Sequence, residues 1–424
     1  MNRLFHHRRV VTALGATLLA VAGCAWPPAG SAPPAAEPAA PVSAPGQPAP
    51  PAATPAAAAT PPPVQPYEQA VLSAATALLE PANARLDQPR EVVIDPLIDG
   101  VTGMQSAATR DMGSRLAALI RTRYPRLQLQ PFGSAEVARN PLVLIGTFTG
   151  VNAQRQSAGT REAYRICLAL ADLRTGKLVA KGLAFARPDG VDPTPLASFR
   201  DAPAWVEDPA TQGYVRTCQG TKAGDPINPV YADRIVGAAL VADAMQAYDA
   251  GRYREALDLF TTARAAPGGD QFRVFNGLYL ASWKLGRRER AEQAFGELVD
   301  LGLGQQRLAI KFLFRPGSTA FVDDARLTAP YAMWLRTLAR RTGQRQGCLE
   351  IVGHTSATGP QALNDRLSQL RAETVRSRLL DEAPALERRL ITRGEGSRQM
   401  LVGNGRDDAS DALDRRVEFK VLGC

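Results

Sequence analysis

Histidine is nearly absent from this chain of 424 residues, which has three in all. Two lie close to the N-terminus, and only His354 remains beyond them. No Cys-x-x-Cys pair and no cluster of cysteine and histidine has the spacing of a metal site. A Ser/His/Asp nucleophile system would depend on His354 alone, and we expect that residue to have a structural role at a strand end. We therefore expect no enzyme activity, no catalytic residues and no bound metal or cofactor.

Positive charge is missing from residues 25–66, which contain no Lys or Arg and one acidic residue, Glu37. Almost all the other residues there are Pro, Ala, Ser, Thr or Gly, and such a composition cannot form a hydrophobic core. A polyproline II helix of this length would reach on the order of 100 Å at about 3.1 Å per residue. A disordered linker of no particular length is the alternative interpretation.

The N-terminus is basic and is followed by an apolar run from Val10 to Ala22. This run is too short for a permanent membrane span and is typical of a bacterial secretory signal. It ends in the sequence Val21-Ala22-Gly23-Cys24, which resembles the cleavage site of a lipoprotein signal. The resemblance implies a signal peptide at 1–23, an acylated Cys24 and a linker at 24–66. Ala25 in place of an Asp implies the outer membrane, with the protein facing the periplasm; the alternative is an ordinary cleaved signal with an incidental cysteine.

Four of the five cysteines remain beyond Cys24, and they fall into two pairs in different regions. In an oxidising compartment we expect disulfides between Cys167 and Cys218 and between Cys348 and Cys424. Free thiols or crossed pairings are the alternatives. The formal net charge of +9 is a mild excess. Because export separates the chain from nucleic acid, we expect none as a partner.

Residues 67–228 alternate between helical and strand patterns and predict an α/β domain. The predicted elements are a helix at 67–84, a strand at 92–95, a helix through Met112, Leu116, Leu119 and Ile120, strands at 127–131 and 142–148, and a hairpin of 164–171 and 178–185. The strand ending in Asp95-Pro96 and the hairpin around Asp172 resemble the periplasmic domains of penicillin-binding-protein activators and curli-assembly lipoproteins. Asp95 and Asp99 have no partner base nearby, so we expect turn and cap roles.

Residues 229–305 are helical and repeat themselves at a shift of 35 residues. Gly251, Tyr253, Ala256 and Phe260 recur as Gly286, Arg288, Ala291 and Phe295. The period is close to the 34 residues of tetratricopeptide (TPR) repeats, with room for about two of them. We expect a TPR-like segment that acts as a spacer or docks protein partners; a plain helical hairpin is the alternative.

Residues 306–424 carry the clearest pattern in the chain. The predicted elements are strands at 308–314, 348–353, 390–394 and 416–422 and helices at 325–341 and 361–380. Short motifs occur in order within this frame, namely Gly353-His354-Thr355, then Asn364, Leu367, Ser368, Arg371 and Ala372, then Arg393-Gly394-Glu395-Gly396, then Arg415-Arg416-Val417-Glu418. In this order they resemble the OmpA-like peptidoglycan-binding domain. The resemblance implies a βαβαββ fold, so the whole chain is expected to be a multidomain α/β and α protein.

The helix predicted at 361–380 has two faces. Leu363, Leu367, Leu370 and Leu379 are expected to form a buried stripe, and Asn364, Ser368 and Arg371 lie on the adjacent face at i, i+4 and i+7. Arg371 can offer a planar pair of donors to a carboxylate. Asp365, near the helix start, is expected to interact with the helix dipole.

The family resemblance assigns roles to these residues. It implies that Arg371 holds a carboxylate of diaminopimelate in the peptidoglycan stem peptide, and that an Asp after the Gly-x-Thr segment holds the ammonium of the same residue. Ser356 occupies that Asp position. A hydroxyl supplies no opposite charge, so weaker wall binding, a changed ligand or a scaffold role would follow. The complete predicted set is Thr355, Ser356, Asn364, Ser368, Arg371, Arg415 and Arg416. Because neighbouring residues of a strand point to opposite faces, only one of the last two can face the site.

Together these features predict a non-enzymatic outer-membrane lipoprotein that links the lipid bilayer, through Cys24, to peptidoglycan. The middle domains are expected to dock envelope proteins. The alternative is a regulatory or assembly lipoprotein, such as a cell-wall synthase activator or a secretion accessory, in which the last domain only positions the α/β domain.

Overall fold

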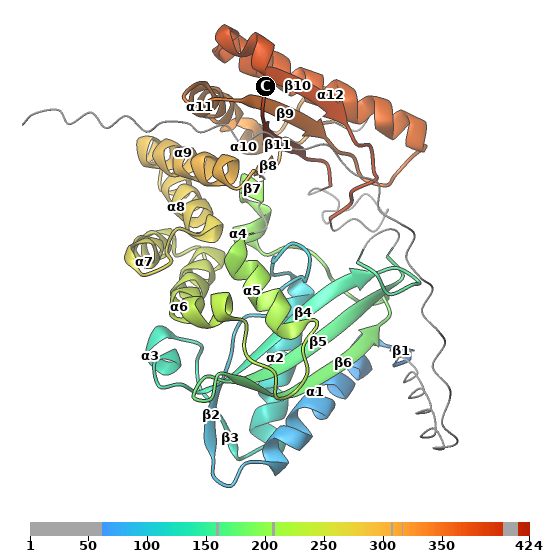
Figure 1. The fold of residues 1–424 in the computed structure, drawn as a ribbon, viewed down its shortest axis with the longest axis vertical. Coiled ribbons are helices and arrows are strands. Elements are labelled where there is room, and N and C mark those ends of the chain that lie inside the picture. Colours follow the sequence, from blue (N-terminus) through green and yellow to red (C-terminus); the bar gives the residue numbers. More distant parts are fainter. Residues whose placement is uncertain (1–61, 158–160, 206–207, 307, 316, 402–413) are drawn as a thin grey trace, which may run out of the picture. The chain divides into compact units, whose positions relative to one another are not determined.

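The computed structural model describes residues 62–157, 161–205, 208–306, 308–315, 317–401 and 414–424, which belong to one compact unit (Figure 1). The predicted signal peptide, Cys24 and the linker up to residue 61 lie outside the described residues. Among the described residues, no helix is both long and apolar enough to span a membrane.

The first part of the described chain is an α/β domain. Its elements are β1 (Val64–Gln65), α1 (Tyr67–Ala84), β2 (Arg90–Ile94), α2 (Ala107–Arg123), β3 (Leu127–Leu129), α3 (Ser134–Val137), β4 (Leu142–Val151), β5 (Ala163–Asp172), β6 (Lys177–Ala186), α4 (Ala197–Arg200), β7 (Ala204–Trp205) and α5 (Pro209–Cys218). Six strands form a mixed sheet in the order β1-β6-β5-β4-β2-β3, in which β2 is parallel to both neighbours. Strands β4, β5 and β6 are antiparallel, so the predicted hairpin is present.

Helices cover both faces of this sheet (Figure 1). On one face, α1 and α2 bury an apolar cluster that includes Leu78, Met112 and Leu116. On the other face, α5 and the first half of α6 (Pro229–Asp249) bury a cluster that includes Ile145, Tyr214 and Tyr231. Each face of the sheet therefore packs against its own layer of helices and forms a separate apolar core, as expected for strands buried on both faces.

Four antiparallel helices follow in sequence, namely α6, α7 (Tyr253–Ala265), α8 (Phe272–Lys284) and α9 (Arg288–Gly304). The turns after α6 and α8 contain Gly251 and Gly286, whose φ angles of 76° and 73° favour glycine. Phe260 and Phe295, the repeated aromatic residues, are fully buried between the helices. The segment is thus two helix hairpins; its assignment as TPR-like stays a prediction.

The last part contains a second, five-stranded sheet. Its elements are β8 (Leu308–Ile310), α10 (Ala325–Thr328), α11 (Tyr331–Gly343), β9 (Cys348–Gly353), α12 (Gln361–Glu382), the 3₁₀ helix η1 (Pro384–Arg389), β10 (Leu390–Gly394) and β11 (Val417–Leu422). The strand order is β10-β9-β11-β8-β7, with β9 and β10 parallel and the remaining pairs antiparallel. The helix expected at 325–341 is interrupted at Ala329 and Pro330, because proline has no N–H to donate to the preceding turn.

The α/β domain contributes the edge strand of this second sheet. Ala204 and Trp205 of β7 pair with β8, and the indole Nε1 of Trp205 donates to the carbonyl oxygen of Thr102 at 2.6 Å. Lys311, just after β8, is partly buried and donates through Nζ to the carbonyl oxygen of Arg200 at 2.6 Å. Burial lowers the pKa of Lys311 to about 8. The segment from Arg200 to Trp205 thus joins the two sheets.

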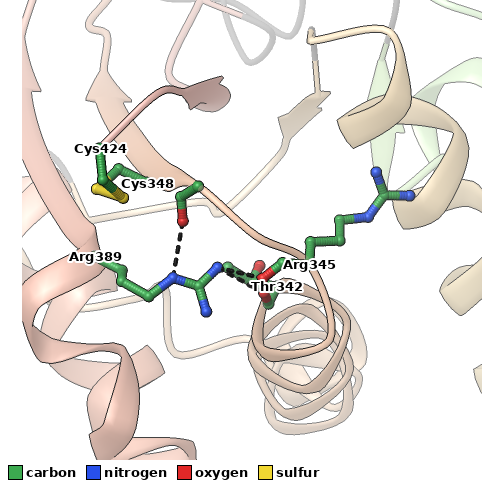
Figure 2. The surroundings of a disulfide bond; sticks show 6 residues. Thr342, Arg345, Cys348, Arg389 and Cys424 are labelled. Carbon is green, nitrogen blue, oxygen red and sulfur yellow. Dashed lines mark hydrogen bonds between the residues drawn. A yellow bond between two sulfur atoms is a disulfide. The ribbon is translucent and has the colours of Figure 1, made fainter. Parts of the chain in front are cut away.

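One of the two expected disulfides is present. Cys348 at the start of β9 is bonded to Cys424 at the end of the chain, 76 residues away in sequence (Figure 2). Arg389 lies beside it and joins the start of β9 to the end of α11, donating to the carbonyl oxygens of Gly347 at 2.8 Å and Arg345 at 2.6 Å. The bond therefore closes a loop that contains α12 and β10.

The expected bond between Cys167 and Cys218 is absent from the structure, in which both residues are free and buried. The Cys167 thiol donates to the Cys218 carbonyl oxygen at 2.7 Å, and the Cys218 thiol donates to the Cys167 carbonyl oxygen at 2.9 Å. The thiols are thus satisfied by backbone acceptors on β5 and at the end of α5. The sequence spacing could not reveal this arrangement.

Candidate functional site

The candidate site lies where β9 meets the N-terminal half of α12. At Gly353, the last residue of β9, an added Cβ would lie 2.0 Å from the carbonyl oxygen of Ser368 on the helix. The strand end and the helix backbone are therefore in direct contact, which no residue with a side chain permits. The loop from His354 to Pro360 connects the two elements and carries the predicted residues Thr355 and Ser356.

Asn364 holds this loop from the first turns of α12. Its Nδ2 donates to the carbonyl oxygen of Thr358 at 3.1 Å, and the Thr358 hydroxyl lies 3.0 Å from the hydroxyl of Ser356. Asn364 and Ser356 are each 5% exposed. The two predicted residues are thus connected through Thr358, and Ser356 presents a hydroxyl where the family pattern has a carboxylate.

Ser368 connects the helix to the loop after β10. Its hydroxyl donates to the carbonyl oxygen of Asp365 at 2.8 Å and accepts from the N–H of Gly396 at 2.8 Å. The carbonyl oxygen of Gly396 in turn accepts from the N–H of Thr355 at 2.8 Å. The side-chain oxygen of Thr355 is buried and has no hydrogen-bond partner among the residues that the structure describes. A buried hydroxyl of this kind is available to a ligand group.

Arg371 is 3% exposed and organises the loop between β8 and α10. Its Nε donates to the carbonyl oxygen of Ser318 at 3.1 Å, and its Nη2 donates to that of Arg315 at 3.2 Å. The guanidinium also lies 4.9 Å from the ring centroid of Phe314. These backbone acceptors and the phenyl ring belong to the site but were not predicted, since no sequence pattern singles them out.

The buried face of α12 differs from the expected one. Only Leu379 of the predicted leucine stripe is buried, whereas Leu363 and Leu370 are exposed and Leu367 is partly exposed. The residues that face the sheet are Asn364, Ser368, Arg371, Ala372, Val375 and Leu379. Polar side chains occupy the first half of this face because each finds a backbone partner in the adjoining loops.

Arg416 lies in a different cluster from Arg371. It is 2% exposed and donates to the Glu418 carboxylate at 2.6 Å and to the Gln399 carbonyl oxygen at 3.1 Å. Residues 416 and 418 share the face of β11 opposite to the buried Val417, as strand alternation requires. Arg415 precedes the strand and is partly buried. Hydrogen bonds through Thr358 and Gly396 thus connect the predicted residues Thr355, Ser356, Asn364 and Ser368. Arg371 shares the buried face of α12 with Asn364 and Ser368, but its side chain contacts the loop after β8, and the side chain of Arg416 contacts Glu418.

His354 completes the cluster around Glu418. The ring is 1% exposed, and its Nε2 lies 3.7 Å from a carboxylate oxygen of Glu418. Burial lowers the pKa of His354, so the ring is neutral at pH 7. Burial alone would raise the pKa of Glu418, but His354 and the Arg416 ion pair hold it well below its usual range. We assign the cluster a structural role.

Asp365 is not available for the ammonium contact that Ser356 lacks. Its Oδ1 accepts from Arg398 at 2.6 Å and from Gln361 at 2.7 Å. Asp365 thus forms an ion pair with Arg398, and its expected interaction with the helix dipole stays a prediction. The candidate site thus offers neutral hydroxyl groups where the family pattern has a carboxylate, and its positive charge comes from Arg371.

Asp95 and Asp99 of the α/β domain were expected to have turn and cap roles, and only Asp99 has such a role in the structure. Asp99 caps a turn, accepting from the N–H groups of Val101 at 3.0 Å and Thr102 at 2.8 Å. Asp95 instead accepts a hydrogen bond at 2.8 Å from the hydroxyl of Tyr231 on α6. Burial raises the pKa of Asp95 to about 7. In the described part of the chain, no group of three or more His, Cys, Asp or Glu side chains is placed to hold a metal ion.

Comparison with known proteins identifies the last domain. Residues 313–412 match the model of the OmpA family. Outer membrane protein Omp38 of Acinetobacter baumannii is 40% identical over 73 residues, which cover 17% of this chain and 20% of that protein. The chain thus spans about a fifth of the length of this curated relative.

Two solved structures resemble part of the chain. The peptidoglycan-associated lipoprotein from Burkholderia pseudomallei is 25% identical, with a TM-score of 0.22 and coverage of 27% of this chain and 89% of that one. The cell wall anchor of the T6SS from Pseudomonas aeruginosa is 22% identical, with a TM-score of 0.23 and coverage of 28% and 81%. Residues 313–412 form an OmpA family domain, so the resemblance found in the sequence is confirmed for this part of the chain.

Proposed function

We propose that this protein is an outer-membrane lipoprotein that binds peptidoglycan non-covalently through its OmpA family domain. The observation that carries the proposal is that Asn364, Ser368 and Arg371 share one buried face of α12 within that domain. Asn364 and Ser368 also hold the loops that carry the buried hydroxyls of Ser356 and Thr355. A guanidinium suits a carboxylate of the stem peptide, and hydroxyl oxygens accept from its ammonium. Lipid attached at Cys24 and the proline-rich linker would hold the domain below the membrane, facing the periplasm.

The middle parts of the chain have a separate role in the proposal. We assign the docking of other envelope proteins to the α/β domain and the two helix hairpins. The alternative role is that of a regulatory or assembly lipoprotein whose last domain only positions the α/β domain. In that role, the activity of the protein would not depend on the wall-binding site. Retention of the chain on purified sacculi separates the two.

Replacing Arg371 tests the carboxylate contact. We expect Arg371→Ala in the full chain without its signal peptide to reduce retention on sacculi by roughly 10-fold to 100-fold, because a charge-assisted contact contributes about 1.5–3 kcal/mol. The measurement is the bound fraction after sedimentation, with folding checked by circular dichroism. Arg366→Ala removes an exposed arginine from the same helix and should bind like the natural chain. Full retention of a folded Arg371→Ala protein would contradict the wall-binding role.

Restoring the missing carboxylate tests the ammonium contact. We expect Ser356→Asp to increase the affinity for sacculi by about tenfold, because an ionised acceptor binds an ammonium more strongly than a hydroxyl does. The dissociation constant is measured by titration of sacculi. Ser377→Asp adds the same charge to an exposed position of α12 and serves as the matched control. Equal affinities for the two variants would indicate that Ser356 does not face the ligand.

A further inference from the structure

A cleft with a volume of about 680 Å³ opens at the carboxyl ends of β2 and β3 in the α/β domain. The chain that leaves β2 crosses one face of the sheet through α2, and the chain that leaves β3 crosses to the other face, where Val137 of α3 is buried. The loops after two neighbouring parallel strands therefore diverge. Open α/β sheets bind ligands in the crevice at such a point.

The cleft has the size and lining of a ligand site. Its volume lies within the range of about 300–1,000 Å³ that is typical of small-molecule sites. Leu97 and Leu129, which follow or end the two strands, contribute apolar surface. Along α2, the cleft is lined by Thr109, Gly113 and Ala117, which lie at intervals of four residues and therefore on one side of the helix. These small side chains leave the space beside the helix open.

The two helical walls carry opposite charges. α2 contributes Arg110 and Arg121, and α6 contributes Asp243 and Asp249. Arg110 and Asp249 join the walls through an ion pair of 3.2 Å. Arg121 and Asp243 line the same cleft, and neither has an ion pair or side-chain hydrogen bond within the described part of the chain.

Asp243 has no counterion among the residues that the structure describes, although it is partly buried. Burial and the nearby charge of Glu136 raise the pKa of Asp243. Both effects oppose the ionised form, and a cation placed in the cleft would relieve them. Arg121 is permanently charged and suits a planar carboxylate. The cleft is thus complementary to a molecule that carries one ammonium, one carboxylate and an apolar body.

We propose that this cleft binds a short peptide with free termini, placing its ammonium near Asp243, its carboxylate near Arg121 and its apolar side chains against Leu97 and Leu129. An extended peptide offers these groups in one narrow molecule, at about 3.3 Å per residue. The α/β domain is then a peptide receptor in its own right. This role is independent of wall binding, because the site in the OmpA family domain shares no residue with the cleft.

Calorimetric titration of the full chain without its signal peptide tests the proposal. The probe is the tetrapeptide Ala-Leu-Leu-Ala with free termini, compared with its N-acetylated and C-amidated forms. We expect the free peptide to bind and each blocked form to bind about tenfold more weakly, since each loses one charge-assisted contact. Absence of binding by the free peptide, or equal binding of all three forms, would overturn the proposal.

Two variants test which residue contacts which end of the peptide. Arg121→Ala should abolish the difference between the free and amidated peptides, and Asp243→Asn should abolish the difference between the free and acetylated peptides. Ala117→Phe fills the cleft and should prevent binding. Arg123→Ala, an exposed neighbour outside the cleft, is the control and should behave as the natural chain. Unchanged preferences in the first two variants would refute the assignment. Retention on sacculi, measured in parallel, should not change in Arg121→Ala.

Discussion

Gly353→Ala is expected to destabilise the protein by about 3 kcal/mol or more, because the added methyl group has no space. Its Cβ would lie 2.0 Å from the Ser368 carbonyl oxygen, and that oxygen belongs to helix backbone, which cannot rotate away as a side chain can. Relief requires α12 to move away from β9. Such a movement would also displace Asn364 and Arg371, so wall binding should fall together with stability. Denaturant unfolding measures the first effect and retention on sacculi the second.

Gly343→Ala is the matched control, since the same group is added where no atom lies within 4 Å. Gly343 is the last residue of α11, and alanine favours helix over glycine by up to about 1 kcal/mol. The control should therefore be as stable as the natural chain or slightly more stable. Equal unfolding midpoints for the two variants would show that α12 and β9 are less closely packed than the backbone contact indicates.

Arg416→Ala is expected to cost about 3–5 kcal/mol at pH 7, because it leaves the partly buried Glu418 carboxylate without the nearer and more deeply buried of its two cationic partners, the other being Lys420 at 3.8 Å. The double variant Arg416→Ala with Glu418→Ala should recover much of this loss. If Arg416 instead served the wall peptide directly, its removal would weaken retention on sacculi and leave unfolding unchanged. Denaturant unfolding of the two variants decides between these outcomes.

The stability cost of Arg416→Ala is expected to change with pH in a defined direction. In the natural chain the pKa of Glu418 is depressed, so its stabilising contribution is present above the ordinary value of 4.5 and is lost as the pH falls through the lower folded value. Without Arg416, this pKa moves upward, because burial opposes the charged form and one of the groups that lower the pKa is removed. The stability difference between the natural chain and Arg416→Ala should therefore be largest near neutral pH and smaller below about pH 4.5.

Local sequence patterns were sufficient to predict the ends of those elements that are bounded by glycine or proline. β9 and β10 have the predicted bounds, and α12 begins at the predicted residue. Pro360 precedes this helix, and Gly353 and Gly394 end the two strands, so the turn residues and the apolar patterns agree. Asn364, Ser368 and Arg371 were predicted to share a face of α12 from local spacing as well, since i, i+4 and i+7 positions lie on one side of a helix. Thr355 and Ser356 were predicted from the family resemblance alone.

The environment of those residues could not be predicted, because it depends on segments distant in sequence. The leucine pattern indicated which face of α12 would be buried, and the prediction was wrong at Leu363 and Leu370. Backbone acceptors at Arg315 and Ser318, more than 50 residues away in sequence, make it possible to bury Arg371 instead. The helix α5 and the strand β7 were not predicted at all. β7 has only two residues, which is too short for an alternating pattern.

The pairing of β7 with β8 determines how freely the last domain can be exchanged between proteins. A fragment that starts at residue 306 would leave β8 as an open edge, with unpaired backbone groups that favour association with other chains. The same cut would remove the Arg200 carbonyl oxygen that accepts a hydrogen bond from the partly buried Lys311. The OmpA family domain of this chain therefore depends on a strand from outside the domain. A gene fusion that transferred it would have to carry residues 196–205 as well, or replace the strand that they provide.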